Sequence, residues 1–157
     1  MRILGIDPGL AIVGYALVNY TDNKPVLEAS GSIRTDKDAE TPERLLDIYN
    51  DLSTIIEYYK PDCAAIEKLY FFRNQKTIIP VAEARGVILT VLQKHHINMY
   101  EYTPIEVKQV LTGYGRASKK EVEQMVKYSL NSEQLPKLDD TVDAIAIAIC
   151  RGRNLLF

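Results

Sequence analysis

The sequence predicts an α/β fold in which a mixed sheet of five strands is flanked by helices. Short apolar segments typical of strands come first, and later strands alternate with longer segments whose apolar residues recur at helical spacing. Strands joined by tight turns pair antiparallel, whereas strands separated by a helix pair parallel through a crossover. The composition, 46% hydrophobic and 25% charged over 157 residues, is ordinary for a globular protein, so we expect residues 1–157 to form a single domain.

Three antiparallel strands are expected at the start of the chain. The apolar segment 2–7 and the segment 14–20 are separated by a Pro8-Gly9 turn, which predicts a hairpin. A third strand is expected over 26–34, because the residues 22–25 before it are typical of a turn.

The helices are predicted from capping residues and apolar spacing. Thr41 and Pro42 suit the start of a helix whose leucines and isoleucines recur at helical spacing and which ends before Pro61. Ser118 and Glu121 form a capping-box pattern that begins another helix, ending near residue 130. The remaining expected elements are strands at 63–66 and 97–102 and helices at about 77–94, 104–111 and 139–151.

Charge, cysteine content and hydropathy restrict the function classes. A net charge of −2 argues against a protein that coats polyanions over its whole surface, although it leaves a nucleic-acid enzyme with local basic clusters open. Cys63 and Cys150 lie in apolar segments without metal-ligand spacing, which predicts two buried apolar side chains. No apolar segment approaches the roughly 18 residues that span a bilayer, and the N-terminus lacks a signal-peptide pattern. We expect a cytoplasmic protein with no membrane partner.

Four carboxylates lie where secondary elements begin or end. Asp7 and Glu67 each follow an apolar strand, and Asp140 and Asp143 lie three residues apart at the start of the last helix. Each has an ordinary alternative explanation: an aspartate that begins a turn, a solvated strand end, or acids that complement a helix dipole. Taken together they indicate a site for a hard cation such as Mg²⁺, which prefers oxygen ligands. The adjacent Asp139 leaves open which member of that pair takes part.

These acidic positions belong to a set of motifs that extends over nearly the whole chain. The set comprises Gly5-Ile-Asp7-Pro-Gly9, Ile66-Glu67, Ala84-Arg85-Gly86, Tyr102-Thr-Pro104, Val107-Lys108, Gly113-x-Gly115-x-Ala117-x-Lys119 and Asp140-x-x-Asp143-Ala. It resembles the RuvC family of Holliday-junction resolvases. The resemblance implies an RNase H-like fold and a metal-dependent endodeoxyribonuclease of DNA recombination and repair. Such an enzyme acts as a homodimer and cuts two opposed strands of a four-way DNA junction symmetrically.

Phosphodiester hydrolysis explains why carboxylates are needed at such a site. Two divalent cations about 4 Å apart activate the water and stabilise charge on the attacking and leaving oxygens. Asp7 is expected to bridge two Mg²⁺ ions, for which Mn²⁺ can substitute, and Lys119 is expected to be catalytic by stabilising charge in the transition state. The other expected metal ligands are Glu67, Asp140 and Asp143.

Basic and aromatic residues are the expected DNA contacts. The resemblance points to Tyr70 as the aromatic that stacks on bases at the crossover, with Phe71 and Phe72 as alternatives, at least one of which we expect to be a core residue. Lys119 and Lys108 match basic positions of the family, although an exposed lysine on a helix is the alternative for either. The further DNA-binding residues expected are Arg73, Lys76 and Arg116.

The expected partners follow from the two-fold symmetry of a junction. The helix at 77–94 has apolar residues on more than one face, so we expect it to form the homodimer contact. The resemblance also implies a branch-migration helicase complex as a partner. A kinase of the actin-like class is disfavoured, because the chain has room for only one of its two domains and lacks a Walker motif. A non-catalytic junction binder would gain nothing from four carboxylates, whereas an RNase H-like nuclease of RNA·DNA hybrids stays open.

Overall fold

The computed structural model describes residues 1–68 and 75–154, with side chains undescribed at 75–77. A five-stranded sheet has the order β3-β2-β1-β4-β5. The first three strands, β1 (Arg2–Asp7), β2 (Ile12–Thr21) and β3 (Lys24–Arg34), pair antiparallel. Strand β4 (Cys63–Glu67) pairs parallel with β1, and β5 (Asn98–Tyr102) pairs parallel with β4. The predicted mixed sheet is therefore confirmed, with antiparallel strands first and parallel crossovers later.

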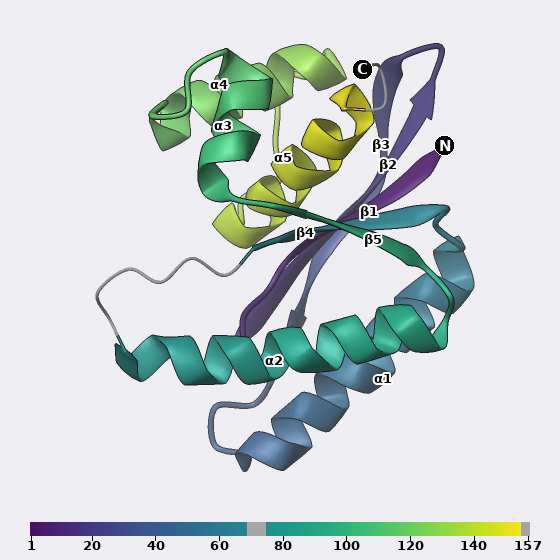
Figure 1. Ribbon diagram of the computed structural model, residues 1–157, viewed down its shortest axis with the longest axis vertical. Coiled ribbons are helices and arrows are strands. Elements are labelled where there is room, and N and C mark those ends of the chain that lie inside the picture. The colour runs from purple at the N-terminus through teal and green to yellow at the C-terminus, as the bar shows by residue number, and fades with distance from the viewer. Residues whose placement is uncertain (69–74, 155–157) are drawn as a thin grey trace.

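Helices cover both faces of the sheet (Figure 1). Helices α1 (Thr41–Tyr59) and α2 (Gln75–Lys94) lie on one face. Helices α3 (Pro104–Thr112), α4 (Lys119–Leu130) and α5 (Asp139–Arg153) lie on the other. Within the described ranges, no helix has the length and apolar character needed to cross a membrane.

The N-termini of α3 and α4 are both fixed by capping boxes. In α4 the Ser118 hydroxyl accepts a hydrogen bond from the backbone N–H of Glu121, whose carboxylate in turn accepts from the backbone N–H of Ser118. This confirms the predicted capping box, and Thr103 with Glu106 forms a second one at α3. The two boxes satisfy backbone donors that the first helical turn would otherwise leave unpaired. Lys119, the first residue of α4, is therefore held in a defined helical turn.

The alternation of side chains along the strands divides the core between the two faces. In β1, Leu4 and Ile6 pack against α1 and α2, whereas Ile3 packs on the side of α5. In β4, Cys63 and Ala65 likewise face α5. Because side chains alternate with a period of two, the next odd-numbered positions, 7 and 67, belong to the α5 face of the sheet. Both Cys63 and Cys150 are free thiols buried in this core, as predicted.

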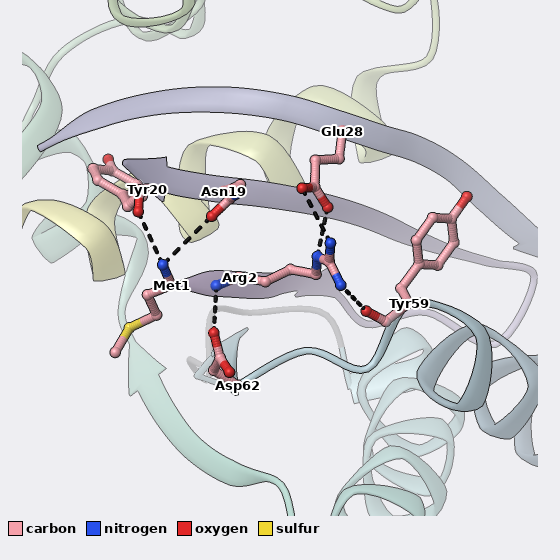
Figure 2. Close-up of polar contacts among 7 residues, drawn as sticks. All are labelled: Met1, Arg2, Asn19, Tyr20, Glu28, Tyr59 and Asp62. Carbon is pink, nitrogen blue, oxygen red and sulfur yellow. Dashed lines mark hydrogen bonds and ion pairs between the residues drawn. The ribbon is translucent and has the colours of Figure 1, made fainter. Parts of the chain in front are cut away.

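The opposite end of β1 has a network of complementary polar contacts (Figure 2). The Arg2 guanidinium donates from Nε to Glu28 at 2.6 Å and from Nη1 to the carbonyl of Tyr59 at 2.5 Å. The backbone N–H of Arg2 donates to Asp62 Oδ2 at 2.7 Å. The N-terminal ammonium of Met1 donates to the carbonyl of Tyr20 at 2.9 Å. These contacts join β1 to β2, β3 and the connection between α1 and β4.

Candidate active site

Asp7 and Glu67 are brought together by parallel pairing of the strands that they terminate. Ile6 lies opposite Ile66 in the register of β1 and β4, so the two carboxylates end adjacent strands at the same edge. Both belong to the face that α5 covers, and the first two turns of α5 contribute Asp140 and Asp143. The strand ends and the helix N-terminus thus assemble the four predicted carboxylates, which are far apart in the sequence.

Two glycines allow α5 to lie directly on the sheet. A Cβ atom at Gly14, which pairs with Asp7 across β1 and β2, would overlap the backbone carbonyl of Asp140. A Cβ atom at Gly5 would likewise overlap the carbonyl oxygen of Ala144. Any larger residue at either position would push the helix and its acids away from Asp7. The buried Thr141 adds a further tie, since its hydroxyl donates to the carbonyl of Gly31 at 3.2 Å.

The site concentrates negative charge in a partly buried position. Burial, followed by the charges of Glu67, Asp143 and Asp140, raises the pKa of Asp7 to about 8, against the smaller opposing effect of Lys119. Burial and the charge of Asp143 also raise the pKa of Glu67, although a hydrogen bond with Asp7 opposes this. Burial similarly raises the pKa of Asp143, while Lys119 lowers it. Raised carboxyl pKa values are typical of sites that bind a cation or perform acid–base chemistry.

Lys119 lies beside the acidic cluster and distinguishes between two adjacent aspartates. Its Nζ atom is 3.0 Å from Asp139 Oδ2 and 3.7 Å from Asp143 Oδ2. Burial alone would lower the pKa of Lys119, but the bond to Asp139 and the charge of Asp143 raise it. The Asp139 side chain is 74% exposed and pairs with the lysine, whereas Asp140 is among the charges that act on Asp7. Asp140 is therefore the member of the pair that faces the cluster.

Two pockets are lined in part by acids of the cluster. The first has a volume of about 230 Å³ and is lined by Glu67 and Asp143, with Lys108 and Lys119 as its basic residues. Apolar side chains of α3, α4 and α5 complete this pocket, among them Val107, Val122 and Ile147. The second is a more open hollow of about 460 Å³, lined by Asp140, Arg44, residues 9–12 and the Pro80-Val81 segment of α2. The predicted Lys108 and Lys119 thus both line the first pocket, and neither lines the second.

The other predicted DNA contacts have different outcomes. Tyr70, Phe71, Phe72 and Arg73 lie outside the described residues. Lys76 belongs to the first turn of α2, where only the backbone is described. Arg116 is exposed in the connection between α3 and α4. The sequence analysis missed Arg44, whose only sequence signal was a basic residue in the first turn of a helix.

The oxygen atoms of the four acids suit a hard divalent cation. Their side chains, however, are not positioned to coordinate one together. All four acids present oxygen atoms, and Asp7 lies partly buried among like charges that a cation would neutralise. Among residues 1–68 and 75–154, however, no three histidine, cysteine, aspartate or glutamate side chains are positioned so that they could hold a metal ion together. The electrostatics therefore support the predicted site, whereas the side-chain geometry does not define its ligands.

The fold and the strand-end carboxylates define a nuclease of RNase H-like architecture, and comparisons with known proteins identify the family. The family model described as crossover junction endodeoxyribonuclease RuvC matches residues 3–151. A relative from Alkaliphilus metalliredigens (strain QYMF) with the same description is 49% identical over 154 residues, which cover 98% of this chain and 94% of the relative. The chain therefore belongs to the RuvC family, which confirms the resemblance seen in the sequence.

Two solved structures support this assignment. The Thermus thermophilus RuvC structure superposes with a TM-score of 0.93 at 28% identity, covering 99% of this chain and 96% of that one. The structure of T. thermophilus RuvC in complex with Holliday junction substrate has a TM-score of 0.92 at 29% identity, covering 99% and 94% of the two chains. Both the predicted fold class and the prediction of a nuclease are thereby confirmed.

Proposed function

We propose that this protein resolves Holliday junctions in DNA recombination and repair, by metal-dependent hydrolysis of two opposed strands. The observation that carries the proposal is the partly buried carboxylate cluster at the ends of β1 and β4, to which α5 adds two more acids. Family membership supports the class of enzyme, and the T. thermophilus relative was solved with a Holliday junction as substrate. We further propose that residues 1–157 act as one nuclease domain and that the protein acts in the cytoplasm, where it meets DNA.

The proposed metal ligands are Asp7, Glu67, Asp140 and Asp143, which would hold two Mg²⁺ ions, with Mn²⁺ as a substitute. Bound cations supply Lewis acidity at the scissile phosphate. The raised pKa of Asp7 supports this assignment, because charges gathered in a buried site favour binding of a cation that relieves their repulsion. The charges of acids from both pockets act on Asp7, which is the proposed bridging ligand.

The proposed role of Lys119 is to stabilise negative charge on the phosphate as the transition state forms. Its ammonium group lies at 3.7 Å from Asp143, so a phosphate bound through cations at the carboxylate cluster would lie within its reach. An ammonium aimed at developing charge lowers the barrier when it binds the transition state more strongly than the ground state. Lys108 lines the same pocket and is the proposed contact for a flanking phosphate. The proposed contacts Tyr70, Phe71, Arg73, Lys76 and Arg116 rest on the family resemblance.

Helix α2 is the proposed dimer contact, on a narrower face than the sequence indicated. Of its apolar residues, Ile88, Val91 and Leu92 are buried in the protein's own core, so these three cannot contribute to the dimer. The face left open includes Ile79, which is 66% exposed, and Gly86, where an added Cβ would meet no atom within 4 Å. Small residues let two helices approach closely. A branch-migration helicase complex is a further proposed partner.

The dimer is tested by placing a charge on this face. Gly86→Arg should convert the protein from dimer to monomer in sedimentation at micromolar concentration, because a long cation cannot fit between close helices. It should also replace paired incisions of a junction by single nicks. Leu46→Arg is the matched control, since Leu46 is similarly exposed but lies on α1. A Gly86→Arg variant that stays dimeric would move the contact elsewhere.

The substrate is tested with the purified protein on labelled four-way junction, linear duplex and RNA·DNA hybrid, each with and without Mg²⁺. We expect cleavage of the junction only, at symmetric positions in two opposed strands, and only with the cation. Equal or faster cleavage of the hybrid would instead establish the alternative RNase H-like activity, since the carboxylates serve either substrate equally well.

A further inference from the structure

A basic residue that the family motifs did not include lines a different pocket beside the carboxylate cluster from the one that the two lysines line. Arg44, in the first turn of α1, lines the second pocket together with Asp140 and the turn that follows Asp7. Lys108 and Lys119 line the first pocket with Glu67 and Asp143. Asp7 lies two residues before Gly9 of the second pocket, and acids that line each pocket contribute to its raised pKa.

The side chain of Arg44 is oriented by hydrogen bonds that lead to the active-site turn. Its Nε atom donates to the Thr35 hydroxyl at 2.9 Å, and that hydroxyl donates to the carbonyl of Leu10 at 2.7 Å. The backbone N–H of Thr35 also donates to the carbonyl of Ala11 at 3.2 Å. Arg44 is therefore tied through Thr35 to the segment directly after Asp7-Pro8-Gly9, and a shift of that turn would move the guanidinium with it.

The terminal nitrogens of Arg44 remain available for an anion. Throughout residues 1–68 and 75–154, no carboxylate lies within ion-pair distance of Arg44, in contrast to Lys119 with two acidic neighbours. A guanidinium held at Nε still presents the N–H groups of both terminal nitrogens, whose planar fork matches phosphate oxygens. A basic side chain that is oriented but unpaired, in a hollow beside a nuclease site, has the features of a phosphate-binding group.

We propose that Arg44 binds a backbone phosphate of the cleaved strand, on the opposite side of the scissile phosphate from Lys108 and Lys119. The proposal rests on the proposed function, since it takes the scissile phosphate to lie at Asp7. A DNA strand that crosses the carboxylates must then lie over both pockets. A basic side chain in each pocket holds the strand against a site whose own negative charge repels DNA. Arg44 is in this sense a positioning residue, which sets how far the strand extends beyond the scissile bond.

The first test measures junction affinity as a function of salt, without divalent cations, for Arg44→Ala and Arg44→Gln. Both variants should bind about 5- to 10-fold more weakly, and the slope of log affinity against log salt should be shallower by about 0.9, as for loss of one phosphate contact. Arg44→Lys should retain most of the slope, because it keeps the charge. Arg34→Ala is the matched control: Arg34 also donates from Nε to a hydroxyl, that of Ser32, but it is exposed outside both pockets.

The second test locates the phosphate. Neutral methylphosphonates are placed singly at successive positions on either side of the cleavage site, and affinity is measured for the wild type, Arg44→Gln and Lys108→Ala. The wild type should lose affinity at positions on both sides. The affinity of Arg44→Gln should no longer respond to a methylphosphonate at one position on one side of the cleavage site. The affinity of Lys108→Ala should no longer respond to one on the other side.

Specific outcomes would overturn the proposal. Arg44→Gln with the affinity and salt slope of Arg34→Ala would show that Arg44 binds no phosphate. Insensitivity of Arg44→Gln and Lys108→Ala at the same phosphate would show that both lie on one side. Failure of the wild type to prefer a junction over duplex would instead refute the proposed function. Thermal unfolding of each variant checks the fold. Thr35→Val removes only the hydroxyl that orients Arg44, so it should lose affinity as well, but less than Arg44→Gln does.

Discussion

The two ends of β1 have opposite electrostatic character. At its start, Arg2 pairs with Glu28 and donates to a backbone carbonyl, and its own N–H is accepted by Asp62. At its end, Asp7 is partly buried beside other carboxylates, and desolvation together with their charges raises its pKa to about 8. At the first end, charged groups are paired with partners of opposite sign (Figure 2). At the second end, like charges gather around Asp7, and Lys119 opposes their effect only weakly.

This difference indicates where function opposes stability. Charges buried with like charges destabilise a fold unless something outside the chain compensates them. A paired surface cluster needs no such compensation, and its net contribution is small. The end of β1 at Asp7, which destabilises the protein, is thus the end where a cation and a phosphate are proposed to bind. Four substitutions or measurements test this contrast, in decreasing order of expected effect.

The largest effect is expected from Asp7→Asn, which keeps the side-chain size but removes the charge. Cleavage of a junction should fall by at least roughly 10²-fold, as for loss of a group that stabilises a transition state. Junction binding should survive, because the substitution lowers repulsion toward phosphate. Single-turnover cleavage and fluorescence anisotropy measure the two quantities. Asp143→Asn should behave alike, and a variant that keeps more than about a tenth of the wild-type rate is not a metal ligand.

A second prediction concerns the close approach of α5. In Gly14→Ala, the new Cβ would overlap the carbonyl of Asp140, so the helix start must shift away from Asp7. The free energy of unfolding should fall by about 1 to 3 kcal/mol, and cleavage should fall by about 10²-fold, as expected for a misplacement near 1 Å. Denaturant unfolding and cleavage assays measure both. Normal cleavage in a destabilised variant would mean that the position of α5 is not critical.

The third prediction is a pH dependence of stability without divalent cations. A carboxyl whose pKa is raised in the folded state stabilises the fold below its ordinary pKa, and this contribution is lost as the pH rises toward the folded value. For Asp7 the loss extends from its ordinary 3.8 to about 8. Between pH 5 and 8 the wild type should therefore lose on the order of 2 to 4 kcal/mol relative to Asp7→Asn. Parallel stability curves for the two proteins would contradict this.

The smallest effect is expected at the opposite end of the strand. Glu28→Gln makes the same change of carboxylate to amide as Asp7→Asn, but it removes a half-exposed partner of Arg2. Stability should fall by less than about 1 kcal/mol, with no change in cleavage rate. A substantial loss of cleavage would show that the two ends of β1 are coupled, and the contrast between them would then fail.

Local patterns in the sequence were sufficient to predict most of the elements. Turn residues separated the first strands, and a capping box located the start of α4 at Ser118. The acids were predicted because each follows or precedes an apolar segment and belongs to a family motif, and their role as metal ligands stays a prediction. The face of α2 was predicted less well, since Ile88 and Leu92 are covered by the protein's own core. Periodicity shows that a helix has apolar residues, but not which of them a neighbouring layer covers.

The sequence alone determined the fold class and the family and singled out the carboxylates as candidates, because strand period, turn chemistry and motif spacing are properties of neighbouring residues. The tertiary structure decided which aspartate of the adjacent pair faces Asp7, since Lys119 takes Asp139 through packing of α4 against α5. It also showed that Gly14 is small because Asp140 lies on it, and that Arg44 reaches the site through Thr35. These relations join residues distant in the chain, and only the packing of layers brings such residues within contact distance.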